Sequence, residues 1–150
     1  MSDFAAVISQ RGKYVGPPAG PSMQPLLRMH RDAAVLVAPK FPLKKYDVIL
    51  YRRANGQYVL HRIIGVKKQG YVLCGDALWR KEFPILDDMV IGVMEGYFKD
   101  EVYHSCNELS YRIYSVFRTC CRPLRELAAR INSFGMALKN KLRGNGSNEN

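Results

Sequence analysis

The stretch Tyr46 to Val66, YDVILYRRANGQYVLHRIIGV, decides the fold class of this 150-residue chain. Two segments rich in β-branched and aromatic residues, 46–53 and 58–66, flank the dipeptide Asn55-Gly56. Asn-Gly is the strongest short-range hairpin signal, because both residues tolerate a positive φ. The stretch therefore predicts an antiparallel hairpin inside a β-rich domain.

Further strands are predicted on both sides of this hairpin. Segments of similar composition cover residues 33–37, 71–74 and 89–98, and Gln69-Gly70 is expected to form a second turn. Residues 22–105 are therefore predicted to form one domain whose fold class is mainly β. The preceding residues, 1–21, contain several glycines and prolines, which predicts an irregular N-terminal arm.

After residue 105 the apolar residues recur at helical spacing. Pro123 interrupts this pattern and suits the first turn of a second helix. Residues 106–143 are therefore predicted to form two basic amphipathic helices, and residues 144–150 a disordered tail. The apolar stripe of these helices consists of Leu109, Ile113, Val116, Phe117, Cys120, Leu124, Leu127, Ile131, Phe134, Leu138 and Leu142.

The composition is that of one ordinary globular domain, since 47% of the residues are hydrophobic and 24% are charged. The longest apolar runs, 33–38 and 89–94, are far shorter than the ~20 residues that span a bilayer. The N-terminus lacks a basic region followed by an apolar stretch, so neither a transmembrane helix nor a signal peptide is predicted. The four cysteines form no CxxC pair, which predicts a reduced, cytoplasmic chain without a zinc site; no cofactor is expected.

The net charge of +10 indicates an anionic partner or simply a basic surface. Residues 106–150 hold 8 basic and 3 acidic side chains and thus carry half of the net charge. Basic amphipathic helices can lie on an anionic membrane surface, or their apolar stripe can pack on the β-rich domain or on a second subunit. Nucleic acid is a poorer candidate, because the helices lack a helix-turn-helix pattern and aromatic residues spaced for base stacking.

Ser22 and His61 are the first candidates for catalysis. Serine becomes a nucleophile when a base accepts its proton, and imidazole does so near neutral pH. Ser22 lies in the loop Gly20 to Pro25, and His61 lies within the second strand of the predicted hairpin. Taken alone the pair is unspecific, because a histidine in a strand usually has a structural role.

The sequence around these two residues is more specific. In chain order it reads G-x-S-M-x-P-L from Gly20, YDVILY from Tyr46, LHRIIGV from Leu60, Gly75-Asp76, and VIGV from Val90. This series resembles the type I signal peptidases and their LexA-like superfamily over roughly half of the chain. Bacterial members have lysine where this chain has His61, so the chain is similar to the endoplasmic-reticulum and archaeal-type branch, which uses serine and histidine.

The resemblance implies roles for four residues. Ser22 matches the nucleophile and His61 the general base. Asp76 and Glu82 match the two acids of the Ser-His branch, and either of them can accept from the other imidazole nitrogen and stabilise the imidazolium. Glu82 is slightly preferred, because an aspartate after glycine often closes a turn instead.

Three features depart from the family pattern. Gly20 and Pro21 replace the Ser-Gly of many bacterial members, so the oxyanion relies on the Ser22 backbone N–H and on a second donor that the sequence does not identify. Residues 77–80 (ALWR) replace an Asn-rich run. The transmembrane anchor of the membrane-bound signal peptidases is not found.

Two functions follow as hypotheses. The first is a serine endopeptidase of signal-peptidase type, which cleaves an extended precursor or leader peptide that pairs with an exposed strand edge. The second is a non-catalytic module with the same fold, which binds a peptide or a membrane surface.

Overall fold

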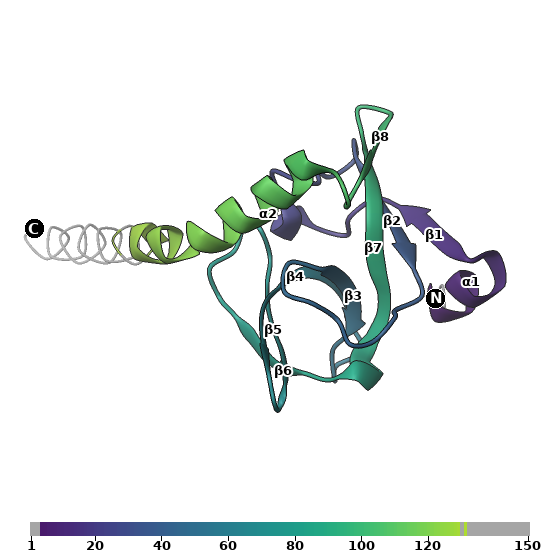
Figure 1. Cartoon of the computed structure of the whole chain (residues 1–150), viewed down its shortest axis with the longest axis horizontal. Helices are drawn as coiled ribbons and strands as arrows, with labels where there is room; N and C mark the ends of the chain where they lie inside the picture. The colour runs from purple at the N-terminus through teal and green to yellow at the C-terminus, as the bar shows by residue number, and fades with distance from the viewer. Residues whose placement is uncertain (1–3, 130, 132–150) are drawn as a thin grey trace, which may run out of the picture.

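The computed structural model describes residues 4–129 and 131 as a β-rich body with a helical extension (Figure 1). An eight-stranded antiparallel sheet dominates this part of the chain, as predicted. A further helical segment, residues 122–129 and 131, follows the last of the elements. In chain order the elements are α1 (Phe4–Arg11), β1 (Lys13–Gly16), the 3₁₀ helix η1 (Pro21–Met23), β2 (Ala33–Val37), β3 (Val48–Arg52), β4 (Tyr58–Lys67), β5 (Gly70–Cys74), β6 (Glu82–Ile85), the 3₁₀ helix η2 (Asp87–Met89), β7 (Val90–Lys99), β8 (Val102–Ser105) and α2 (Leu109–Cys120).

The sheet has the strand order β1-β2-β7-β3-β4-β5-β6, and β8 pairs with β7. The predicted central hairpin is β3–β4, in which Val48 pairs with Arg62 and Arg52 with Tyr58. Gly56 has a φ of +83° in its turn, a conformation that glycine adopts without strain. The predicted strands at β2, β5 and β7 are also confirmed, whereas the short strands β1, β6 and β8 were not predicted.

The N-terminal segment differs from the irregular arm that we predicted. Helix α1 and strand β1 occupy most of residues 4–16, and β1 pairs antiparallel with β2. Ile8, only 3% exposed, anchors α1 in the core. The glycines that suggested a loop mark the ends of elements instead: Gly12, at φ +74°, connects α1 to β1, and Gly16 ends β1.

The central strand β3 is buried on both faces, because the curved sheet has a core on each side. Val48 and Leu50 belong to one buried cluster, which also contains Met23 and the helix residue Tyr111. Ile49 and Tyr51 belong to the other. Successive side chains of a strand point to opposite faces, so neighbouring residues of β3 and β4 serve different cores.

The C-terminal helices break where the sequence predicted. Helix α2 ends at Cys120, Cys121 forms a turn, and helical structure resumes at residue 122, beside Pro123. Figure 1 shows this extension pointing away from the sheet. Nothing in residues 4–129 or 131 forms a helix both long and apolar enough to cross a membrane. The rest of the predicted second helix, residues 132–143, and the predicted tail, 144–150, lie outside the described residues.

Candidate active site

Ser22 is the middle residue of η1, the short 3₁₀ turn that Pro21 opens. The Met23 side chain next to it is completely buried and fixes the turn against the core. The carbonyl oxygen of Ser22 accepts a hydrogen bond of 2.8 Å from the backbone N–H of Ala77. Two contacts therefore position Ser22, one with the core and one with the chain that follows β5.

His61 lies on β4 and is 2% exposed. Its Nδ1 atom lies 3.3 Å from the Tyr51 hydroxyl and 3.2 Å from Oε1 of Glu82. Tyr51 and His61 share a face of the hairpin because Ile49 pairs with His61 and Tyr51 pairs with Val59. Glu82 reaches the same face from the start of β6. One imidazole nitrogen is thus held by two partners, one from β3 and one from β6.

Gly75 brings Ser22 and His61 to one place. A Cβ atom at Gly75 would lie 2.6 Å from the Ser22 carbonyl oxygen and 3.1 Å from Nε2 of His61. A side chain does not fit there, so glycine lets the chain pass between the η1 turn and the imidazole. The two predicted residues line one cleft of about 220 Å³, together with Arg53 and Leu78. Among the described residues, no hydrogen bond joins the Ser22 side chain to His61.

The contacts of His61 define its protonation and its tautomer. Burial lowers the pKa of His61 to about 4, although the charge of Glu82 acts in the opposite direction. The imidazole is therefore neutral at pH 7. Its proton belongs on Nδ1, where the Glu82 carboxylate accepts it, so Nε2 carries the lone pair. Nε2 is the nitrogen next to Gly75, in the state required of a general base.

Arg53 is a site residue that the sequence analysis missed. Its Nε donates to Oε2 of Glu82 at 2.8 Å, and its Nη2 forms an ion pair with Oε1. Burial acts to raise the pKa of the Glu82 carboxyl, but hydrogen bonds from Arg53 and Tyr51 outweigh it and lower this pKa. The sequence did offer a signal for Arg53: side chains alternate between the two faces of a strand, which places residues 49, 51 and 53 on one face.

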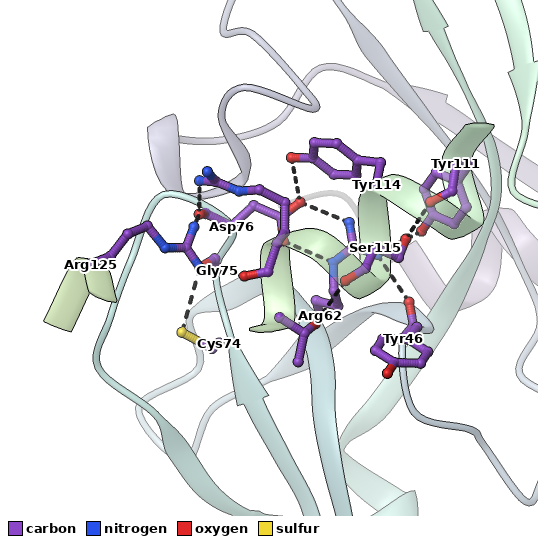
Figure 2. A network of polar contacts seen from close by, with 11 residues as sticks. Tyr46, Arg62, Cys74, Gly75, Asp76, Tyr111, Tyr114, Ser115 and Arg125 are labelled. Carbon is purple, nitrogen blue, oxygen red and sulfur yellow. Dashed lines mark hydrogen bonds and ion pairs between the residues drawn. The ribbon is translucent and has the colours of Figure 1, made fainter. Parts of the chain in front are cut away.

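No hydrogen bond or ion pair joins Asp76 to His61, whereas Glu82 lies 3.2 Å from Nδ1, so the geometry favours Glu82 over Asp76, the other predicted acid. The Asp76 carboxylate accepts two hydrogen bonds from Arg62, of 2.8 and 2.7 Å, and both side chains are almost fully buried. Figure 2 shows Arg62 between Asp76 and residues of α2. Its Nη1 donates to the Tyr111 hydroxyl at 3.1 Å and to the Ser115 hydroxyl at 2.7 Å. Asp76 is a structural residue because its charge is already neutralised on the far side of β4.

Comparisons with known proteins neither add to nor oppose this interpretation: no family model matches the chain, and no curated protein or solved structure matches it. Within the part of the chain that the structure describes, no group of three or more His, Cys, Asp and Glu side chains could hold a metal ion.

Proposed function

We propose that the chain is a serine endopeptidase of signal-peptidase type that cleaves an extended precursor or leader peptide. One observation carries the proposal: Glu82 and Tyr51 hold Nδ1 of His61, while no hydrogen bond among the described residues occupies Nε2, and His61 lines the same cleft as Ser22. A base needs an orienting partner on one nitrogen and a reacting group at the other, and this arrangement supplies both.

The reaction proceeds in two steps. The Ser22 hydroxyl oxygen attacks the peptide carbonyl carbon while its proton moves to Nε2 of His61, and Glu82 stabilises the imidazolium. The tetrahedral intermediate collapses when that proton passes to the leaving amine, which breaks the C–N bond and leaves an acyl ester on Ser22. Water, deprotonated by His61, then hydrolyses the ester. The Ser22 backbone N–H is our candidate for one oxyanion donor.

An unpaired stretch of β4 supports an extended substrate. β3 pairs with β4 along residues 58–62, but β5 pairs with β4 only from Arg62 onward. Among the described residues, no strand therefore pairs with the β5-side edge of residues 58–61, and these residues line the cleft. A peptide strand added there would lie beside Ser22 and His61, with its affinity supplied by backbone hydrogen bonds.

A fluorophosphonate probe tests the proposal without a known substrate. An activated Ser22 displaces fluoride from the probe and becomes labelled, whereas Ser22→Ala abolishes labelling. Ser110→Ala, which removes a hydroxyl on the exposed side of α2, is the matched control and should label like wild type. Mass spectrometry of candidate precursors incubated with wild type and with Ser22→Ala then locates the cut. Unlabelled wild-type protein that still binds peptides favours the non-catalytic module.

We propose contact with an anionic membrane surface as a second function, carried by the apolar face of the C-terminal helices. This face is exposed over its whole described length, from Leu109 (70% exposed) through Phe117 (60%) to Ile131 (62%). Large exposed apolar patches mark interaction sites. A second copy of a helix that carries the same excess of basic residues is repelled, whereas anionic lipid is attracted. The free cysteines support a reducing compartment, so we place the protein in the cytoplasm, peripheral to the membrane.

Vesicle sedimentation tests the membrane contact. Wild type should sediment with anionic vesicles more than with neutral ones, and less in 1 M salt, where the Debye length is about 3 Å. Phe117→Glu with Leu124→Glu, two exposed positions of the apolar face, should abolish binding. Val66→Glu with Val102→Glu, two exposed apolar residues of the β-rich body, is the control with the same change in charge. Equal sedimentation of both variants and wild type contradicts the proposal.

A further inference from the structure

The segment 75–77, which follows β5, touches both members of the proposed catalytic pair. The Ala77 N–H donates to the Ser22 carbonyl oxygen at 2.8 Å. Gly75 passes so close that an added Cβ would lie 3.1 Å from Nε2 of His61. A shift of this segment would therefore move Ser22 and open the space over the imidazole.

The same segment is held from its other side by the C-terminal helices. The Asp76 carbonyl oxygen accepts hydrogen bonds from Nη2 of Arg118 and Nη1 of Arg125. The Tyr114 hydroxyl donates to the Asp76 carboxylate at 3.1 Å. Figure 2 shows Tyr114 and Arg125 reaching Asp76 from these helices. Three side chains that come after residue 105 thus converge on one residue of the segment.

These contacts are costly if stability is their only purpose. Neither Arg118 nor Arg125 forms an ion pair with a carboxylate among the described residues, and the Nε atoms of both are buried without a hydrogen-bond acceptor. Burial, and then the charge of Arg118, lower the pKa of Arg125. Two like charges directed at one carbonyl oxygen destabilise each other, so the arrangement points to a positional role.

We propose that α2 and the helical segment after it position Ser22 and His61 by holding segment 75–77, with Arg118 and Arg125 as positioning residues. This inference rests on the proposed function, but the contact itself is independent of catalysis. The helices lie on the side of β4 that Arg62 faces, whereas the cleft lies on the side that His61 faces. Segment 75–77 connects the two sides, because the side chain and carbonyl of Asp76 contact the helices while Gly75 and Ala77 contact His61 and Ser22.

The double variant Arg118→Gln/Arg125→Gln tests the proposal in the full chain. Lys68→Gln/Arg112→Gln, which removes two charges at exposed positions, is the matched control. Amide hydrogen exchange of Ala77 reports directly on its bond to Ser22 and should become about tenfold faster or more in the double variant only. The limiting rate of fluorophosphonate labelling should fall about tenfold or more, with little change in the affinity for the probe, because a misplaced nucleophile reacts slowly once the probe is bound.

The imidazole titration of His61, followed by NMR, is a third reading. The charged and titratable groups that act on this ring are Tyr51, Arg53 and Glu82 at close range and Asp76 through its charge, and none of them is changed. A loosened Gly75 admits water to the ring, so the titration midpoint should move upward toward 6.5 in the double variant.

The experiments test the positioning role and the peptidase proposal separately. If Arg118→Gln/Arg125→Gln shows the wild-type rate of Ala77 exchange and the wild-type rate of labelling, the positioning role is overturned. Absent labelling of the wild-type protein overturns the peptidase proposal instead, and Ala77 exchange and the His61 titration still decide the positioning role. If the double variant does not fold, Tyr114→Phe, which removes only a hydroxyl, replaces it. That variant should accelerate Ala77 exchange to a smaller extent, and an unchanged rate overturns the proposal.

Discussion

His61 and Arg62 are neighbours on β4, yet they face opposite sides of the sheet and have opposite kinds of surroundings. Arg62 donates five hydrogen bonds, to Asp76, Tyr46, Tyr111 and Ser115, and is 1% exposed. His61 is just as buried and lines the cleft, but its hydrogen bonds among the described residues involve Nδ1 and leave Nε2 without one.

Arg62 and His61 illustrate the difference between a buried polar group that stabilises the fold and one that is available for catalysis. A buried polar group that serves stability has every donor satisfied, whereas a base must keep one atom free for the reaction. The two acids divide in the same way: Asp76 neutralises Arg62, and Glu82 orients His61.

The largest expected effect is on the catalytic side. His61→Ala should reduce the fluorophosphonate labelling rate about 10⁴-fold or more, because the serine proton loses its acceptor. Ser22→Ala should abolish labelling. In peptide cleavage, the variant Ser22→Ala/His61→Ala should be no slower than either single variant, since the two residues act as one unit. Independent, multiplicative losses in cleavage rate contradict the dyad. The free energy of unfolding of Ser22→Ala should stay close to the wild-type value.

The two amide variants should separate the acids. Glu82→Gln should lower kcat by about 10²- to 10⁴-fold without unfolding the protein, because an amide holds the wrong imidazole tautomer. Asp76→Asn should chiefly lower the free energy of unfolding, because it leaves the Arg62 charge without its partner. Kinetics and urea denaturation of both variants give the answer. Wild-type kcat in Glu82→Gln means that the enzyme works as a bare Ser-His dyad.

Arg62→Met should produce the largest loss of stability, about 3–5 kcal/mol, because it leaves the buried Asp76 carboxylate unpaired. Adding Asp76→Leu should recover part of this loss, since removing both charges removes the uncompensated one. Arg52→Met, at an exposed position of β3, is the control. Urea denaturation measures all of these. If Arg62→Met is no less stable than Arg62→Met/Asp76→Leu, the structural role of the Arg62–Asp76 pair is contradicted.

The sequence was informative where the signal is local. The Asn55-Gly56 turn and the β-branched segments beside it predicted β3 and β4 correctly, and Pro123 predicted the helix break. Strand β1 was missed because glycines and prolines dominate its surroundings, and its four residues become a strand through pairing with β2.

The candidate site was predicted in part. The motifs singled out Ser22 and His61, which the structure brings to one cleft, and they preferred Glu82 over Asp76 without deciding between the two acids. The choice between the two acids depends on Arg62, which binds the Asp76 carboxylate although the two residues are 14 positions apart in the chain. The strand alternation could have placed Arg53 on the face of His61, but its pairing with Glu82 and the contacts of Arg118 and Arg125 come from tertiary packing, which no local spacing encodes.

The pH dependence of stability should reveal the buried His61. Its pKa is about 4 in the folded protein and about 6.5 when unfolded, so the unfolded chain binds a proton in this window and the folded protein does not. The free energy of unfolding should therefore fall by about 3 kcal/mol as the pH falls from 6.5 to below 4. His61→Gln should lack this component, and the difference between the two proteins isolates it from the carboxyl groups. Parallel curves contradict the low pKa.

The smallest expected effect sharpens the comparison at Arg53, the cation on the catalytic side. Arg53 fixes the Glu82 carboxylate, but its positive charge also opposes protonation of His61. Arg53→Gln removes this repulsion, so the pKa of His61 should rise, by about one unit or less because Arg53 is partly exposed to solvent. Arg52→Gln, one position earlier and at the exposed end of β3, should leave the pKa of His61 unchanged. NMR titration of the imidazole measures the pKa of His61 in both variants. If this pKa falls in Arg53→Gln, the arginine acts mainly by holding Glu82 in place, because loss of the carboxylate contact destabilises the imidazolium.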